Sequence, residues 1–512
     1  MCTYKAVLAI FLCGTISLSA WELNCRVFPA DSLQEIRIRA TAHKERQEIS
    51  SLRVGYIRDD GFFSDGTGPV RDHIWQILPS RTEKDTIVVS VMLRDEHEHT
   101  LFLHDPRRQK AAYRPEGTML KIYSLRPDLF SLRPYKGNVH THSNRSDGSS
   151  SVSDVLIHSR RAGLDFIALT DHWLFAPSQE MKELEKKYRT GVEVFSGEEV
   201  HSDGGMLHSI SLGGNWQVSR RRELVDEAKK IIPEIAGKFP HLNKIELQYC
   251  ADSVARFAKM RQAGSFIIYS HPYWKLLNRY HFTEKFNEYM LNNADYDALE
   301  LFNATVPFSM MLNRWHQLAL EGRNPAVVSV SDNHYAPGLE LSQFYTIIFA
   351  PDCTVESFRN AVKERRSVAR APGRFSMASW RHIWARDALI GKMNRFMAKQ
   401  DALLKKIESG TVVEQAAVSA LREELKEINE ARRKVPPRPA VMDESLLIGD
   451  LRLVRFAMFL EEDYWPRHDE ICLRQFKLLT KLSQGDETVR SAIADCVKEL
   501  ENLRKNFYAP IQ

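Results

Sequence analysis

The sequence predicts an α/β protein with a central barrel, preceded by a β-sandwich-like domain and followed by a helical extension. Residues 135–375 alternate short apolar runs with amphipathic segments, which is typical of strands joined by helical crossovers and predicts a largely parallel sheet. Residues 21–134 contain short alternating segments separated by turns, and residues 376–512 are strongly helical. Because 512 residues exceed the size of one ordinary core, several domains are expected.

The composition is that of a globular protein, with 43% hydrophobic and 27% charged residues. A net charge of +5 is small for this length and gives no support for a nucleic-acid partner, which would require a concentrated basic face. The chain contains neither a P-loop motif nor a GxSxG elbow. Their absence argues against nucleotide-driven phosphate transfer and against a serine hydrolase.

Residues 1–20 have the pattern of a signal peptide. Lys5 precedes a short apolar run that ends in small residues. We therefore expect a secreted or periplasmic protein with no membrane span after cleavage, and an uncleaved N-terminal anchor is the alternative. Five cysteines follow without a CxxC pattern. Cys472 and Cys496 fall in one helical region, and the sequence does not decide whether they pair.

In residues 21–134, the segments 34–42, 86–94 and 119–125 alternate polar and apolar residues between turns. This pattern predicts a small β-sandwich, which we interpret as a stabilising or positioning module because it carries no chemical signature. In residues 376–512 the apolar spacing is that of an amphipathic bundle. We expect that region to pack on the barrel, bind a protein partner or self-associate.

Seven strand-like runs lie in the central region, and this number favours a closed barrel over a small open sheet. Helix-like segments at 151–163, 252–264 and 308–322 separate some of them, and each ends in glycine, a common helix stop. The seven runs are 137–142, 165–172, 192–200, 207–214, 265–272, 298–304 and 327–334.

Metal-competent side chains gather at the C-terminal ends of these runs, where catalytic side chains converge in barrels. They are His140 and His142 in the first run, His172 in the second, Glu199 in the third, His271 in the fifth, and Asp332 with His334 in the seventh. His208 is the exception, because it lies near the start of the fourth run. Asp147 follows the first run, where an Asx turn before a helix is the alternative interpretation.

The spacing supports shared ligation, because residues i and i+2 of a strand point to one face. His140 and His142 form one such pair, and Asp332 and His334 form another. Imidazoles suit zinc, manganese or iron, and carboxylates can bridge two cations. Nine candidate ligands therefore predict two or three divalent metal ions.

The segments "HTHSNRSDG", "ALTDHW", "SGEEV", "SHP" and "SDNH" resemble, in this order, the motifs of the PHP (polymerase and histidinol phosphatase) superfamily. The resemblance covers roughly 135–372. It implies a distorted seven-stranded (β/α) barrel with a multinuclear metal site, as in phosphatases and exonuclease-type phosphodiesterases.

Position by position, the resemblance implies three metals, of which the first two share Glu199. The first would be held by His140, His142, Glu199 and Asp332, the second by Glu199, His208 and His271, and the third by Asp147, His172 and His334. Many members have histidine where this chain has Asp147. The family's Gly-x-Glu favours Glu199 over Glu198. Asp171 is expected to orient the metal ligands without binding a metal itself. Glu300 and Asn303 are expected on the rim of the barrel that carries the ligands.

The resemblance leaves a few roles open. Asp147 or His334 is expected to protonate the leaving group, whereas His158 and His201 fall outside the pattern and are interpreted as structural. Lys275 and Arg279 are interpreted either as phosphate contacts or as solvated loop residues.

The predicted function is an exported phosphoesterase that hydrolyses mono- or diesters, most simply a small-molecule phosphate ester, by metal-activated hydroxide. The alternatives are a metal hydrolase acting on another bond and a non-catalytic, metal-stabilised scaffold protein. The sequence does not specify the substrate, the metal or the oligomeric state.

Overall fold

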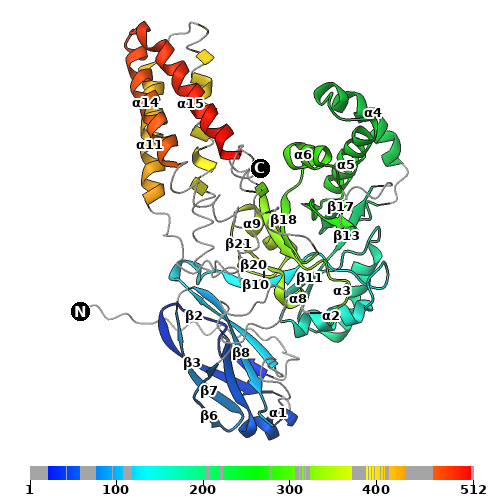
Figure 1. The fold of residues 1–512 in the computed structure, drawn as a ribbon. Coiled ribbons are helices and arrows are strands. Elements are labelled where there is room, and N and C mark those ends of the chain that lie inside the picture. The colour runs from blue at the N-terminus through cyan, green and yellow to red at the C-terminus, as the bar shows by residue number, and fades with distance from the viewer. Residues whose placement is uncertain are drawn as a thin grey trace, which may run out of the picture.

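The computed structural model shows a β domain, a central α/β region and a helical C-terminal region (Figure 1). The predicted leader, 1–20, lies outside the residues that it describes. The described residues are 21–41, 43–57, 76–94, 96–107, 118–202, 208–219, 223–276, 279–280, 282–305, 311, 314–315, 318, 323, 325–338, 340–371, most of 388–409, 414–433 and 465–508.

Two sheets of the N-terminal region share one core. Alternation places Ile36, Ile38 and Ala40 inside, together with Leu101 and Ile122 of the facing sheet. This sandwich-like arrangement agrees with the expectation from alternation. One sheet is β1 (Trp21–Leu23), β3 (Ser32–Ala40), β7 (Thr86–Leu93) and β6 (Ser80–Glu83), and the other is β2 (Val27–Pro29), β9 (Thr118–Leu125), β8 (His97–His104), β4 (Arg53–Ile57) and β5 (Gln76–Ile77).

The central region contains two five-stranded sheets, and all seven predicted runs contribute strands to them. The first has the order β12 (Glu193–Phe195), β11 (Phe166–Ala168), β10 (Arg133–Asn138), β20 (Tyr345–Ala350) and β21 (Ser367–Arg370). The second has the order β13 (Gly197–His201), β14 (His208–Leu212), β15 (Phe266–Tyr269), β18 (Ala298–Asn303) and β19 (Ala326–Val330).

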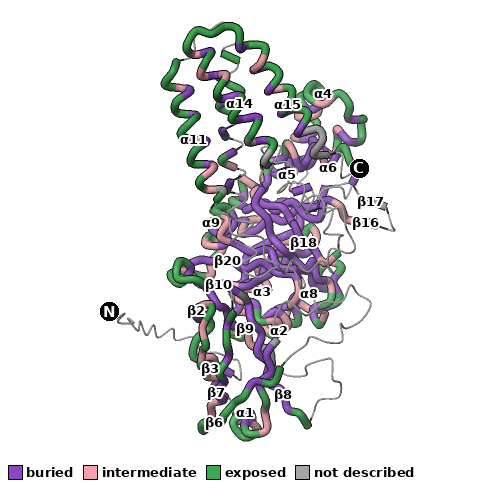
Figure 2. Tube along the Cα trace, turned by 60° about the vertical axis from the view of Figure 1, so that its left-hand side comes forward, coloured by how far each residue is buried: buried purple, intermediate pink, exposed green. Residues whose placement is uncertain are grey.

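The two sheets adjoin through isolated parallel bridges, Thr141 with Asn333 and His172 with Glu199. Their inner faces share a core that includes Phe166 and Ile268, and most residues of the central strands are buried (Figure 2). The mixed α/β class is confirmed. The expected predominance of parallel pairing is not observed, because four of the eight pairings are antiparallel.

Helices cover these sheets, and several of them begin at capping boxes or end before a glycine. A capping box of Ser151 and Asp154 starts α2, and Gly163 with φ +73° follows its end. Asn243 and Glu246 start α5 in the same way. Described residues of the predicted helix 308–322 are helical. The helices are α2 (Val152–Arg161), α3 (Ala176–Tyr188), α4 (Glu223–Lys238), α5 (Lys244–Gln262), α6 (Glu284–Asn293), α8 (Glu340–Gln343) and α9 (Val355–Lys363).

The C-terminal helices α11 (Gln415–Arg433), α14 (Trp465–Ser483) and α15 (Arg490–Tyr508) share an apolar core that includes Leu421, Leu479 and Ile493. Cys472 on α14 and Cys496 on α15 are buried and are not joined by a disulfide bond. Among the described residues, no helix combines the length and apolar character needed to cross a membrane.

Candidate metal centre

All nine predicted ligands meet at one end of the two central sheets, where the bridges Thr141–Asn333 and His172–Glu199 join them. We call this end the mouth, and Glu199 lies in the middle of the nine ligands. Its carboxylate oxygens lie 2.6 Å from His172 Nδ1, 2.9 Å from His208 Nδ1 and 3.3 Å from His271 Nε2. Oxygen Oε2 also lies 3.3 Å from His140 Nε2 and 3.4 Å from His142 Nε2. Glu199 is fully buried, so a charge at this position requires nearby cations.

Glu198, the alternative ligand, points the other way. Because successive side chains on a strand alternate, the Glu198 carboxylate leaves the mouth and accepts hydrogen bonds from the backbone amides of Val218 and Ser219. The structure therefore places Glu199, and not Glu198, among the histidines.

The antiparallel direction of β14 explains the exceptional position of His208. His201, the last residue of β13, is in register with His208, the first residue of β14. The start of one strand and the end of the other thus lie at the same rim. Sequence reasoning that assumed parallel strands could not foresee this.

His140 and His142 point to one site, as their i and i+2 spacing predicts. Asp332 and His334, by contrast, fall in different groups because Asp332, with a φ of 49°, departs from strand geometry. The Nε2 atoms of His140 and His142 are 3.1 Å apart, and each lies within 3.2 Å of Asp332 Oδ1. His271 Nε2 approaches Asp332 Oδ2 at 3.9 Å. One cation could be held among His140, His142 and Asp332, and an adjacent one among His140, Glu199 and His271.

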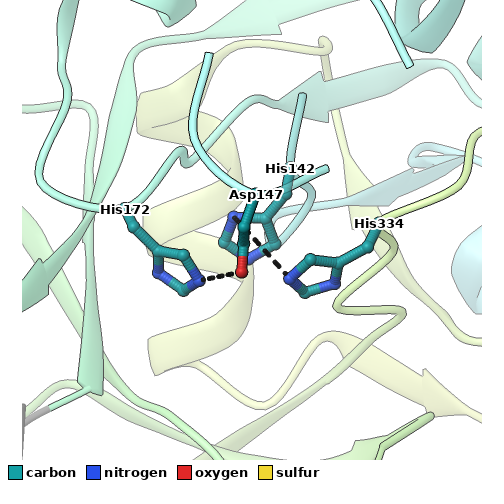
Figure 3. Close-up of side chains that lie close together, drawn as sticks. All are labelled: His142, Asp147, His172 and His334. Carbon is teal, nitrogen blue, oxygen red and sulfur yellow. Dashed lines mark ion pairs between the residues drawn. The ribbon is translucent and has the colours of Figure 1, made fainter. Parts of the chain in front are cut away.

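A second cluster lies at the open side of the mouth (Figure 3). Asp147 lies between His172 and His334, with carboxylate oxygens 3.2 Å from His172 Nε2 and 3.3 Å from His334 Nε2. His142 Nδ1 is 4.0 Å from Asp147 Oδ1 and completes a group that could hold a metal ion. The Asp147 side chain is 56% exposed, so this group faces solvent.

The loop that carries Asp147 is fixed from two sides. Asp171 is buried and accepts hydrogen bonds from the Ser143 backbone amide and hydroxyl and from the Ser146 hydroxyl, at 2.5–2.8 Å. On the other side, the backbone amide of Ser149 donates to the His334 carbonyl at 2.8 Å. Asp171 thus holds the loop, and among the described residues it forms no hydrogen bond or ion pair with the metal-competent nitrogens.

Glu300 and Asn303 belong to a hydrogen-bond network that holds the predicted ligands in place. Glu300 Oε1 lies 2.7 Å from His140 Nδ1, and Oε2 accepts hydrogen bonds from the His271 backbone amide and from Asn303 Nδ2 at 2.9 Å. Thr305 Oγ1 donates to Asp332 Oδ2 at 3.1 Å. Carboxylate–histidine pairs of this kind fix the orientation of a ligating ring.

Backbone strain gathers at the mouth, although nothing in the sequence predicts it. Trp173, His271 and Asp332 have φ values of 59°, 25° and 49°, in the region that favours glycine. Two of these three residues are predicted ligands, and the third follows one. Strained backbone that persists in a folded protein is typical of functional sites.

The histidines divide into two electrostatic classes. Burial opposes a charge on His140 and His172, but the neighbouring carboxylates outweigh burial and raise the pKa of His140, and that of His172 to about 10. Burial lowers the pKa of His142 to about 4 and that of His208 to about 3. The histidines hold the pKa values of Glu199 and Asp332 well below their usual range.

The residues fit a group of divalent cations. His142 Nδ1 and His271 Nδ1 are buried and have no hydrogen-bond partner among the described residues. Buried polar atoms are rarely left in this state, and imidazole nitrogens with carboxylate oxygens are ligands for zinc, manganese and iron. The donor set therefore matches bound metal better than an empty polar core.

His201 is the residue that sequence reasoning missed. Its position outside the motifs predicts a structural role, yet its Nε2 lies 2.7 Å from His172 Nδ1 and 3.6 Å from Glu199 Oε2, in a group that could itself hold a metal ion. His158 lies elsewhere, on α2. For Lys275 and Arg279 the structure describes only the backbone, in the β16 (Lys275–Leu276) and β17 (Arg279–Tyr280) hairpin.

The chain is similar to solved structures of PHP-like proteins. One is a two-domain Bacteroides vulgatus protein containing a predicted PHP-like metal-dependent phosphoesterase, with 16% identity, 51% of this chain and 71% of that chain covered, and a TM-score of 0.36. Another, from Bifidobacterium adolescentis and provisionally assigned as a metal-dependent phosphoesterase, has 16% identity, coverages of 39% and 87%, and a TM-score of 0.28.

A Chromobacterium violaceum amidohydrolase, with bound sulfate and no metal, has 17% identity, coverages of 46% and 97%, and a TM-score of 0.29. No family model and no curated protein matches the chain. All three TM-scores lie below 0.5, so the functional proposal depends on the metal centre itself.

Proposed function

We propose that this protein is a multinuclear metal-dependent phosphoesterase. The observation that carries the proposal is the convergence of nine imidazoles and carboxylates, from segments between residues 140 and 334, on one mouth. A single cation needs about four such ligands. The surplus supports at least two cations, and the shared ligands His140 and Glu199 would keep them adjacent.

Divalent cations at such a centre supply Lewis acidity, which neutralises phosphate oxygens and makes water nucleophilic at neutral pH. The chain's own residues would hold them: His140, His142 and Asp332 on one side of Glu199, and His208 with His271 on the other. Adjacent cations are a common means of stabilising both the entering and leaving oxygens of a phosphoryl transfer. This chemistry favours a phosphate ester as substrate.

His334 is the residue placed to protonate a leaving group when the group of Asp147, His172 and His334 holds no cation, because a cation there would occupy its ring nitrogen. Burial alone would raise the pKa of Asp147, but hydrogen bonds from His172 and His334 hold it well below its usual value, so this carboxylate stays ionised and is not the proton donor. His334 has a 37% exposed side chain and lies on the open side of the mouth beside Asp147. Burial opposes a charge on His334, but Asp147 and Asp332 raise its pKa, so the ring can carry a proton at neutral pH.

We also infer that the two central sheets together form the distorted barrel of the PHP type, an inference supported by the two bridges that join them at the mouth. The basic start and apolar run of residues 1–20 support export, and an exported enzyme of this kind would act on small extracellular phosphate esters.

The test is turnover of p-nitrophenyl phosphate and bis-p-nitrophenyl phosphate by protein loaded with manganese or zinc. We expect metal-dependent release of p-nitrophenol that His140→Ala with His142→Ala abolishes, while His158→Ala, the same change on α2, leaves it unchanged. Undiminished activity in the double variant would exclude the proposed centre. Turnover of only amide or lactone substrates in a parallel panel would retain the centre and exclude the phosphate specificity.

A further inference from the structure

His201 is held tightly against the metal centre. It is 4% exposed and lies at the end of β13 opposite His208. Its ring centroid is 3.9 Å from that of His208, 4.5 Å from that of Trp173, and 4.5 Å from that of His172, with the last pair almost perpendicular at 86°. Rings on three sides restrict its rotation, so the short contact between His201 Nε2 and His172 Nδ1 is a fixed feature of the site.

His172 uses both ring nitrogens. Its Nε2 faces Asp147 and the group with His142 and His334, whereas its Nδ1 faces His201 and Glu199. A neutral imidazole has one N–H and one lone pair. If the hydrogen were on Nε2, that nitrogen could not bind a cation, so ligation through Nε2 requires an acceptor for the hydrogen on Nδ1.

Two hydrogen-bond acceptors lie within reach of His172 Nδ1, and they differ in the other groups that they contact. Glu199 Oε2 lies 2.6 Å away, but it also lies within 3.4 Å of the Nε2 atoms of His140 and His142, in the groups that would hold the other cations. His201 Nε2 is 2.7 Å away. When Glu199 is occupied by cations, His201 is the acceptor that remains.

We propose that His201 is a positioning residue of the metal centre: its Nε2 accepts the Nδ1 hydrogen of His172 and so directs the His172 Nε2 lone pair to a cation held with Asp147 and His334. The proposal rests on the metal centre argued above and not on the nature of the bond that is cleaved. It predicts that His201 matters for the cation nearest the open side and not for those on the far side of Glu199.

The test measures metal binding without substrate. Full-length wild type, His201→Phe, His201→Gln and the matched control His158→Phe are dialysed against a series of zinc concentrations, and bound metal is measured by elemental analysis. Phenylalanine keeps the ring shape and removes the acceptor, whereas glutamine restores an acceptor oxygen. Cobalt titration followed by visible absorption reports the same sites spectroscopically, and circular dichroism of the metal-free proteins checks folding.

We expect His201→Phe to bind one cation about 10- to 100-fold more weakly, with the other cations and the fold unchanged. His201→Gln should recover most of the affinity, and His158→Phe should match the wild type. Unchanged affinity in His201→Phe, or equal weakness in the phenylalanine and glutamine variants, would overturn the role of His201. A wild type that binds no zinc or cobalt would instead overturn the metal centre itself.

Discussion

Glu198 and Glu199 are adjacent carboxylates whose side chains point to opposite faces of β13 and therefore have different partners. Glu199 faces six imidazoles, whereas Glu198 binds two backbone amides beyond the strand. Both carboxylates are fully buried, yet only one lies where its charge is compensated by metal-competent groups. The pair therefore offers an internally matched comparison of a proposed metal ligand with a carboxylate that binds backbone amides.

We predict that Glu199→Gln lowers metal affinity by more than about 100-fold, because replacing a ligand that several cations share should exceed the effect of changing a supporting residue. Hydrolytic activity should fall with it. Glu198→Gln keeps an acceptor oxygen for the Val218 amide, loses the longer hydrogen bond from Ser219, and should retain metal. Bound zinc in the two variants, measured under identical dialysis, checks the prediction, and equal metal loss in both would contradict it.

The positions of seven strands along the chain and the metal-competent residues could be predicted from sequence, but the direction of each strand in its sheet could not. Apolar runs that end in His140, His172 or Asp332 identify both the strands and the mouth, because burial and ligand chemistry are local properties. His208 looked exceptional because an antiparallel strand has the same apolar pattern as a parallel one. The role of His201 depends on that register, and the strain at Trp173 depends on tertiary contacts, so neither has a local signal.

The loop between β10 and α2 brings Asp147 back over the ligands that precede it. Gly148 allows this close return, because a Cβ atom there would lie 2.9 Å from the backbone of His142 and Ser143. Separations under 3.0 Å require the backbone to move. The loop geometry, and with it the position of Asp147, therefore depends on this glycine.

We predict that Gly148→Ala displaces Asp147 and weakens binding of the cation on the open side by about 10- to 100-fold. The matched control is Gly237→Ala in α4, where a Cβ would meet nothing within 4 Å and where alanine should stabilise the helix by up to about 1 kcal/mol. Zinc titration of both variants checks the difference. A Gly148→Ala protein with wild-type zinc affinity would show that the loop adapts.

The β domain and the α/β region meet at a buried charged network. Glu98 on β8 accepts hydrogen bonds from Tyr345 on β20 at 2.6 Å and from Tyr123 at 3.1 Å, and it pairs with Lys121 at 2.8 Å. Burial alone would raise the pKa of Glu98, but Lys121, Lys136 and Arg370 outweigh it and hold that pKa well below the usual value. Two of these cations belong to the α/β region, so the charge of Glu98 links the two parts of the molecule.

Because the folded-state pKa of Glu98 is lower than its unfolded value, its contribution to stability is complete above the unfolded pKa, about 4.5, and is lost as the pH falls below it. At pH 7 we predict that Glu98→Gln lowers the free energy of unfolding by about 3–5 kcal/mol, because it leaves buried cations uncompensated. The variant should also lose less stability than the wild type between pH 5 and pH 3.

The control is Glu35→Gln, which removes an exposed carboxylate paired with Arg81 and should change the free energy of unfolding little. Urea unfolding of the three proteins at several pH values measures both effects, and parallel pH profiles for wild type and Glu98→Gln would show that the carboxylate does not hold the two regions together.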